Sequence, residues 1–141
     1  MAITHTIRIG APSEAVFVLY ADVPSWTEWD SQTEDVSLPS GLTQGSAGWL
    51  KPCKGPKARI EVTQVRPGRS FTVESRLPFC RMVFGHDLQD DGVQTEATHW
   101  VRFTGPLAFL FRRVIGTGID ATLPDTLLGL KRVAEGRQTA R

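Results

Sequence analysis

Residues 93–136 read VQTEATHWVRFTGPLAFLFRRVIGTGIDATLPDTLLGLKRVAEG, and the spacing of their apolar residues changes once, at Gly105-Pro106. Before this dipeptide apolar and polar residues alternate, which is typical of a β-strand with one buried face. After it the apolar residues recur every three or four positions, which predicts an amphipathic helix. Proline is favoured in the first turn of a helix, so we expect the strand to end and the helix to begin here.

The expected helix carries a single apolar stripe. Its members are Leu107, Leu110, Phe111, Val114, Ile119, Leu123, Leu127, Leu130 and Ala134. The stripe stays in phase across Pro124, which removes one backbone hydrogen bond and therefore predicts one kinked helix. A helix over 106–136 would be ~46 Å long. Since this exceeds the diameter of a small domain, we expect the helix to lie along a sheet that bends around it.

The chain before this helix is rich in strand and turn signals. The turn signals are Pro39-Ser40-Gly41, Lys54-Gly55-Pro56, Arg66-Pro67-Gly68 and Asp90-Asp91-Gly92. They separate period-two segments at about 34–38, 46–53, 57–66, 69–77, 79–90 and 93–104. Short turns between such segments predict successive antiparallel strands.

The first thirty residues predict a further strand and two short helices. Residues 2–9 are rich in β-branched side chains and indicate a strand. Ser13 is a candidate N-cap for a first helix, and Trp26 and Trp29 share one face of a second. We therefore expect an α+β fold: a curved antiparallel sheet of about seven strands around a long C-terminal helix, with two short helices after the first strand.

Length and composition limit the classes of protein that fit. The 141 residues predict one domain over 1–141, and 40% hydrophobic with 22% charged residues indicates a folded globular chain. Sixteen basic against 15 acidic side chains leave a net charge of +1, which excludes a basic nucleic-acid-binding arm. We expect a small-molecule partner, no nucleic acid and no integral membrane contact; oligomeric state stays open.

Cysteine and histidine patterns point to no metal site. Cys53 and Cys80 lie far apart in the sequence and form no C-x-x-C pair, so we expect free thiols and no zinc site. The longest apolar run, residues 15–21, is too short to span a membrane. We expect a cytoplasmic protein without a metal or cofactor.

Strand parity assigns side chains to the inner face of the sheet. On the last two strands the inner residues are Cys80, Met82, Phe84, His86 and Leu88, then Val93, Thr95, Ala97, His99, Val101 and Phe103. On earlier strands they are Ala58, Ile60 and Val62, then Phe71, Val73 and Ser75. His86 and His99 are thus the only titratable side chains on otherwise apolar faces.

The two histidines lie on opposite arms of one hairpin. A two-residue turn at 91–92 would place them diagonally, whereas a four-residue loop at 91–94 would place them directly opposite. Either register keeps them close. They are candidate catalytic residues, because imidazole exchanges protons near neutral pH, or polar anchors in a ligand pocket. The alternative is a pair of hydrogen-bonded core histidines.

Other aromatic and apolar residues also have two interpretations. Trp26 and Trp29 either line the mouth of a cavity or pack a short helix on the core. Tyr20 places its hydroxyl either in the pocket or in water. Met82 and Phe84 belong either to a cavity wall or to the core.

Two segments resemble a known family. Ala11-Pro12-Ser13-Glu14-Ala15-Val16-Phe17, followed by Ala21-Asp22-Val23-Pro24-Ser25-Trp26-Thr27-Glu28-Trp29-Asp30, resembles the opening of the polyketide cyclase/dehydrase-like group of START/Bet v 1-type (SRPBCC) domains. Three further segments, 98–101, 103–107 and 130–135, also resemble its pattern. The resemblance spans essentially the whole chain and implies a helix-grip fold with a deep hydrophobic cavity for lipids, polyketides, sterols or quinones. No family catalytic motif matches this chain.

Three hypotheses follow from these patterns. The first is a module that binds a small hydrophobic molecule between the sheet and the C-terminal helix. Its expected lining residues are Tyr20, Trp26, Trp29, Phe71, Val73, Met82, Phe84, His86, His99, Val101, Leu110, Ile119 and Leu123. The second is a polyketide cyclase/aromatase or dehydratase-type enzyme that uses His86 and His99, with Tyr20 assisting. The third is a protein-interaction module that uses Trp100 on the outer face of the sheet.

Overall fold

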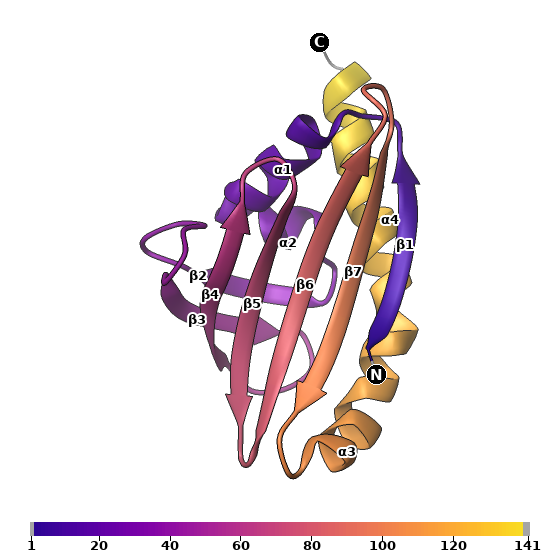
Figure 1. Cartoon of the computed structure of the whole chain (residues 1–141). Coiled ribbons are helices and arrows are strands. Elements are labelled where there is room, and N and C mark those ends of the chain that lie inside the picture. The colour runs from indigo at the N-terminus through magenta and orange to yellow at the C-terminus, as the bar shows by residue number, and fades with distance from the viewer. Residues whose placement is uncertain (1, 140–141) are drawn as a thin grey trace.

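The computed structural model of the protein describes residues 2–139 and shows one antiparallel sheet with all helices on one face (Figure 1). The strands are β1 (Ile3–Ile9), β2 (Thr33–Ser37), β3 (Ala47–Pro52), β4 (Ala58–Arg66), β5 (Ser70–Leu77), β6 (Cys80–Asp90) and β7 (Thr95–Thr104). Their spatial order is β1-β7-β6-β5-β4-β3-β2. Strands β2 to β7 thus follow one another as a meander, and β1 pairs with β7. The expected seven-stranded antiparallel sheet is confirmed.

The helices are α1 (Ser13–Ala21), α2 (Trp26–Trp29), α3 (Ala108–Phe111) and α4 (Thr117–Thr139), with a 3₁₀ turn at Val23–Ser25. A π-helical turn, Arg112–Gly116, joins α3 to α4. The chain is therefore helical from Ala108 to Thr139, and α4 continues through Pro124. The helix-grip fold and the single C-terminal helix are confirmed.

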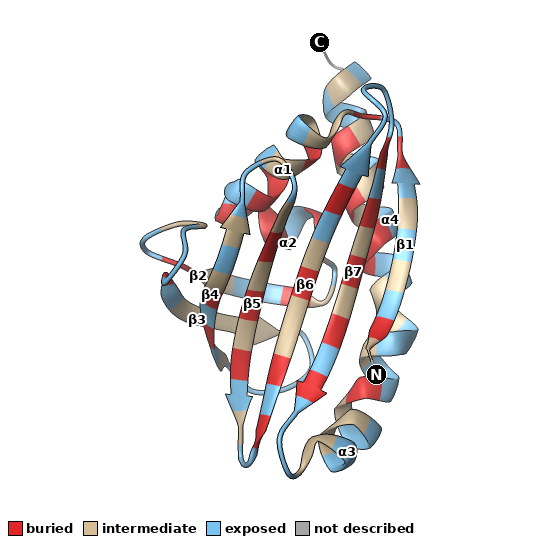
Figure 2. Cartoon of the chain, in the orientation of Figure 1, coloured by how far each residue is buried: buried red, intermediate tan, exposed pale blue. Residues whose placement is uncertain are grey.

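Burial follows the expected parity along the strands. Buried residues alternate with partly buried or exposed ones along β7, so this strand is striped in Figure 2. Ile60, Val62, Phe71 and Val73 are likewise buried on β4 and β5. The core therefore lies between the concave face of the sheet and the helices.

Two details of the expected helices are wrong. Ser13 begins α1 without capping it; instead the Asp90 carboxylate accepts a 2.8 Å hydrogen bond from the Ser13 amide. Val114 is 69% exposed, because the π-turn rotates the apolar stripe so that Ile115 and Gly116 face the sheet. Neither feature has a local sequence signal, since one depends on a distant strand and the other on how the helix meets the sheet.

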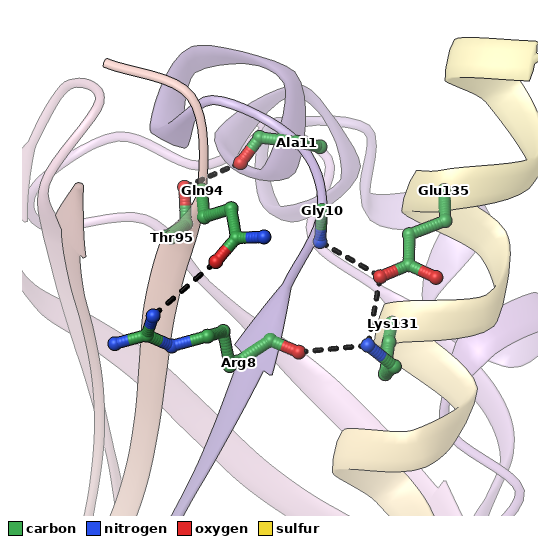
Figure 3. A network of polar contacts seen from close by, with 7 residues as sticks. All are labelled: Arg8, Gly10, Ala11, Gln94, Thr95, Lys131 and Glu135. Atoms are coloured by element: carbon green, nitrogen blue, oxygen red, sulfur yellow. Dashed lines mark hydrogen bonds and ion pairs between the residues drawn. The ribbon is translucent and has the colours of Figure 1, made fainter. Parts of the chain in front are cut away.

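The last turns of α4 are fastened to β1 by a small polar network (Figure 3). The Glu135 carboxylate accepts hydrogen bonds from the Gly10 amide at 2.7 Å and from Lys131 Nζ at 2.8 Å. Lys131 Nζ also donates to the Arg8 carbonyl at 2.9 Å. Beside them Thr95 Oγ1 donates to the Ala11 carbonyl at 2.6 Å. The C-terminal half of α4 is therefore tied to the sheet by backbone as well as side-chain groups.

Candidate functional site

Six aromatic side chains from five elements meet under the short helices. This aromatic cluster consists of Tyr20, Trp26, Trp29, Phe71, His86 and His99. Tyr20 is at its centre, with ring centroids 4.9 Å from Phe71 and 5.7 Å from Trp29. The sequence predicted all six as lining residues, and the structure brings them into mutual contact.

The hairpin register places the two histidines directly opposite each other. Strand β7 begins at Thr95, so the connection is the four-residue loop 91–94, and His86 pairs with His99. Their ring centroids are 4.6 Å apart at an interplanar angle of 73°. The diagonal register that a two-residue turn would give is therefore wrong.

Each histidine is held by a different partner. The Tyr20 hydroxyl and His99 Nε2 share a buried 2.8 Å hydrogen bond. His86 stacks on Phe71 with ring centroids 3.9 Å apart, and its Nδ1 donates to the Phe71 carbonyl at 3.2 Å. Because a carbonyl oxygen can only accept, neutral His86 carries its lone pair on Nε2. Among residues 2–139 this Nε2 has no hydrogen-bond partner.

Burial keeps the whole cluster uncharged. Desolvation lowers the pKa of His86 to about 4, partly offset by its bond to the Phe71 carbonyl. Desolvation, and then the nearby His86, hold the pKa of His99 well below its usual range. Burial also raises the pKa of Tyr20 far above its usual range. At neutral pH the site therefore presents two neutral imidazoles and a neutral phenol.

The tryptophans of α2 differ in their polar contacts. Trp26 Nε1 donates to the Tyr20 carbonyl at 2.9 Å, which fixes α2 against α1. Trp29 is 4% exposed, and its Nε1 has no partner within the described part of the chain. A buried donor without a partner is uncommon and costs free energy. The aromatic cluster thus contains one buried donor without a partner, on Trp29, whereas His86, whose Nε2 also has no partner among residues 2–139, is only partly buried.

A second group of apolar residues lies toward α3. This second core has the buried residues Ile3, Cys80, Met82, Val101 and Phe103, with Leu77, Phe84, Ala108, Phe111, Ile115, Ile119 and Leu123 packed against them and partly exposed. Phe84 contacts both this group and the main core. Seven of the twelve residues in this group are only partly buried, against nine of 27 in the main core, so the second core is the more exposed of the two.

The remaining predicted lining residues divide between these regions. Val73 is part of the main core, whereas Met82, Val101, Ile119 and Leu123 belong to the second core. Leu110 is 43% exposed on α3, away from both. Leu77 and Ile115 contribute to the second core although the sequence did not single them out. Strand parity with Phe71 and Val73 would have identified Leu77, whereas Ile115 faces the sheet only because of the π-turn.

Two surface hollows lie outside this interior. One, of about 200 Å³, lies at the β6–β7 loop and includes Arg8, Asp90 and Gln94 in its lining. The other, of about 340 Å³, lies on β3 and β4, where Lys57 Nζ is 3.8 Å from the centroid of the Trp49 ring. Neither hollow touches the aromatic cluster or the second core.

Trp100 and the cysteines complete the residues considered from the sequence. Trp100 lies over Gly85 on the outer face, donates to Asp87 at 2.9 Å and is partly buried. Cys53 is an exposed free thiol and Cys80 a buried one, as expected. Among residues 2–139 no helix combines the length and hydrophobicity needed to cross a membrane.

Comparisons with solved structures establish the fold. The ZhuI aromatase/cyclase from Streptomyces sp. R1128 aligns over 97% of this chain and 94% of its own, with a TM-score of 0.76 and 18% identity. TTHA0849 from Thermus thermophilus aligns over 97% and 99%, with a TM-score of 0.73 and 16% identity. NE0264 from Nitrosomonas europaea aligns over 99% and 97%, with a TM-score of 0.76 and 12% identity.

Comparison at the sequence level assigns the family. A search of curated protein sequences finds no match. The family model described as polyketide cyclase / dehydrase and lipid transport matches residues 1–135, which is nearly the whole chain. With the helix-grip architecture and the inward-facing apolar surface, this match settles the relationship: the chain belongs to the polyketide cyclase / dehydrase and lipid transport family.

Proposed function

We propose that the protein binds a small, largely apolar molecule between the sheet and the first half of α4. The observation that carries this proposal is the partial exposure of Phe84, Ile119 and Leu123, apolar side chains that pack against the second core yet remain accessible to solvent. The ligand would occupy the second core and reach the aromatic cluster. Neither of the two surface hollows described above lies there, and in this proposal the first half of α4 moves away from the sheet when the ligand enters.

The unpaired groups favour a ligand that carries oxygen. A carbonyl or hydroxyl oxygen that reaches the aromatic cluster can accept from Trp29 Nε1, and a hydroxyl can donate to His86 Nε2. A ligand that pairs the buried Trp29 donor is favoured over a pure hydrocarbon, which would leave this donor unpaired. A lipid, sterol, quinone or polyketide with a terminal oxygen has this chemistry.

Binding is tested with a hydrophobic fluorescent dye and native mass spectrometry of the purified protein. Ile119→Trp adds a bulky side chain next to the second core and should weaken dye binding at least about tenfold. Trp100→Phe, on the outer face, is the matched control and should leave it unchanged. Failure of the wild-type protein to bind dye or retain any molecule would contradict the proposal, as would equal binding by Ile119→Trp.

A second candidate is an enzyme that cyclises or dehydrates a polyketide-like substrate. It is favoured by the opposed His86 and His99 and by the hydroxyl of Tyr20, on α1, which shares a hydrogen bond with His99. A pKa of about 4 makes His86 a weak base at neutral pH, which is why binding is the leading proposal. Turnover of a linear poly-β-ketone that survives both His86→Phe and His99→Phe unchanged would exclude these residues from catalysis.

A further inference from the structure

The end of the molecule that carries the β5–β6 turn and α3 has large apolar side chains in solvent. Phe79 is 75% exposed, Phe109 74%, Val114 69% and Leu110 43%. These four residues are here called the apolar tip. The β5–β6 turn and α3 lie at the lower end of the molecule in Figures 1 and 2, where Figure 2 colours the turn and part of α3 as exposed.

The two segments of the apolar tip are joined by backbone contact. The Leu107 amide donates a 3.0 Å hydrogen bond to the Phe79 carbonyl. A Cβ placed on Gly105 would be 2.8 Å from the same carbonyl oxygen, so only glycine permits this close approach. The turn that presents Phe79 is thereby held against the corner that leads into Phe109 and Leu110.

The backbone conformation of Phe79 and the exposure of its ring both carry a free-energy cost in the folded state. Its φ of 54° is in the left-handed region, and it is the only described residue other than glycine with a positive φ. Left-handed backbone is unfavourable for a residue with a side chain, and glycine would adopt it without strain. Its ring also stays largely in water. Because neither the strained turn nor the exposed ring stabilises the fold, they indicate that Phe79 has a functional role.

Although the net charge of the whole chain is close to zero, positive charge is in local excess around the apolar tip. Residues 75–86 and 97–119 contain five arginines and no Asp or Glu, and one of the five, Arg81, pairs with Glu74 at 3.2 Å. Arg76 and Arg113 are exposed beside the apolar tip and form no ion pair among residues 2–139. Nearby Arg112 has a buried Nε without a partner in the same range.

We propose that the apolar tip docks the protein onto the surface of an anionic lipid bilayer. Phe79, Phe109 and Val114 would enter the boundary between headgroups and acyl chains, while Arg76 and Arg113 contact lipid phosphates. A second copy of the chain fits this surface less well, because a symmetric contact would bring the same arginines together. The proposal does not depend on ligand binding, although such docking would place the second core next to lipid.

Vesicle flotation tests the docking surface. The full-length protein is mixed with phosphatidylcholine vesicles with or without phosphatidylglycerol, at low and high salt. We expect binding to the anionic vesicles, weakened by salt. Phe79→Ser and Phe109→Ser should each reduce it about tenfold, and Arg76→Gln and Arg113→Gln about fivefold each. Val93→Ser, which removes an equally exposed side chain at the opposite end, is the matched control.

Three results would overturn the proposal. The first is no binding of wild-type protein to anionic vesicles, and the second is equal binding by wild-type, Phe109→Ser and Arg113→Gln proteins. The third is self-association in analytical ultracentrifugation that Phe109→Ser abolishes while vesicles stay unbound, which would make this surface a contact between copies. Phe79→Gly separates folding from docking, since it relieves backbone strain yet should still lose vesicle binding.

Discussion

His86 and His99 lie opposite each other as neutral imidazoles, and their neutrality links proton binding to folding. In the unfolded chain both have an ordinary pKa near 6.5, whereas burial lowers both values in the folded protein. The unfolded state therefore binds more protons below pH 6.5. The stabilisation from these groups is complete above pH 6.5 and is lost as pH falls toward the folded pKa of His86, about 4.

Urea unfolding measured at several pH values should show this dependence. Between pH 6.5 and about 4.5 the free energy of unfolding should fall with a slope approaching about 1.4 kcal/mol per pH unit for each histidine. Below that window Asp90 and Glu135 add to the loss, because hydrogen bonds lower their pKa in the folded state. A slope unchanged in the double variant His86→Gln, His99→Gln would show that these histidines do not titrate on unfolding.

Phe79 allows a second prediction at a single residue. Phe79→Gly should raise the free energy of unfolding by up to about 1 kcal/mol, because glycine adopts a φ of 54° without steric cost. Few packing contacts are lost, since the ring is 75% exposed. Urea unfolding beside Phe109→Gly, which introduces glycine at an equally exposed helical position, provides the comparison. A destabilised Phe79→Gly protein would mean that the ring supports the turn.

Sequence patterns predicted which residues form the aromatic cluster, but not how those residues are arranged. Alternation along β6 and β7 placed His86 and His99 on the inner face, but the loop length that sets their register had two solutions. The contact between Tyr20 and His99 joins residues 79 positions apart, so no local pattern encodes it. The positive φ of Phe79 was not predictable from the sequence either, since a proline-phenylalanine turn usually avoids positive φ.

At the scale of elements, α2 and α4 are in close contact at Gly129. A Cβ on Gly129 would be 2.1 Å from the Trp29 carbonyl oxygen, so the two helices approach as closely as glycine allows. One turn earlier Thr126 Oγ1 donates to the Asp30 carboxylate at 3.0 Å. This contact positions Trp29, and through it one wall of the aromatic cluster.

Gly129→Ala should therefore reduce the free energy of unfolding by about 1–3 kcal/mol, because backbone atoms must move apart. Gly136→Ala is a matched control in the same helix, since a Cβ there meets no atom within 4 Å. It should be neutral or stabilising by up to about 1 kcal/mol, because alanine favours a helix. Equal effects of both substitutions in urea unfolding would show that the α2–α4 approach is not tight.

Strands and long helices were predictable where periodicity was strong. The change of period at Gly105-Pro106 marked the corner between β7 and the C-terminal helix, and the stripe crossed Pro124 in phase, as the continuous α4 confirms. The π-turn at Arg112–Gly116 was not predictable, because it shifts the stripe without changing composition. The cap of α1 was missed for a similar reason: its acceptor, Asp90, belongs to a strand far away in sequence.

At the scale of the whole molecule, the two ends of the helix-grip differ in how firmly they are closed. Leu127, Leu130 and Ala134 are fully buried and lie beside the network of Lys131 and Glu135. Ile115, Ile119 and Leu123, at the other end, are only partly buried. Composition and periodicity revealed the apolar stripe but not this gradient, which depends on how far each turn lies from the sheet.

Hydrogen exchange should report the gradient directly. We expect amides of 127–136 to be protected most strongly and those of 108–119 to exchange faster, since local opening is easiest where few apolar contacts are broken. Glu135→Gln should raise exchange in the last turns of α4, because it weakens the bonds to Lys131 and Gly10. Glu28→Gln, at an exposed ion pair with Arg137, is the control. Uniform exchange along α4 would contradict this picture.

The tie between Glu135, Lys131 and β1 also has a mechanical consequence. A rod clamped at one end deflects as a cantilever, so its displacement grows with distance from the clamp. In this protein the clamped end adjoins Gly10, whereas the opposite end, which carries Phe109 and Leu110, is attached to the sheet through the corner where the Leu107 amide donates to the Phe79 carbonyl. Where this corner bends, a small rotation at the clamp is therefore amplified along α4, and the widest opening of the interior comes at the end that faces the proposed bilayer.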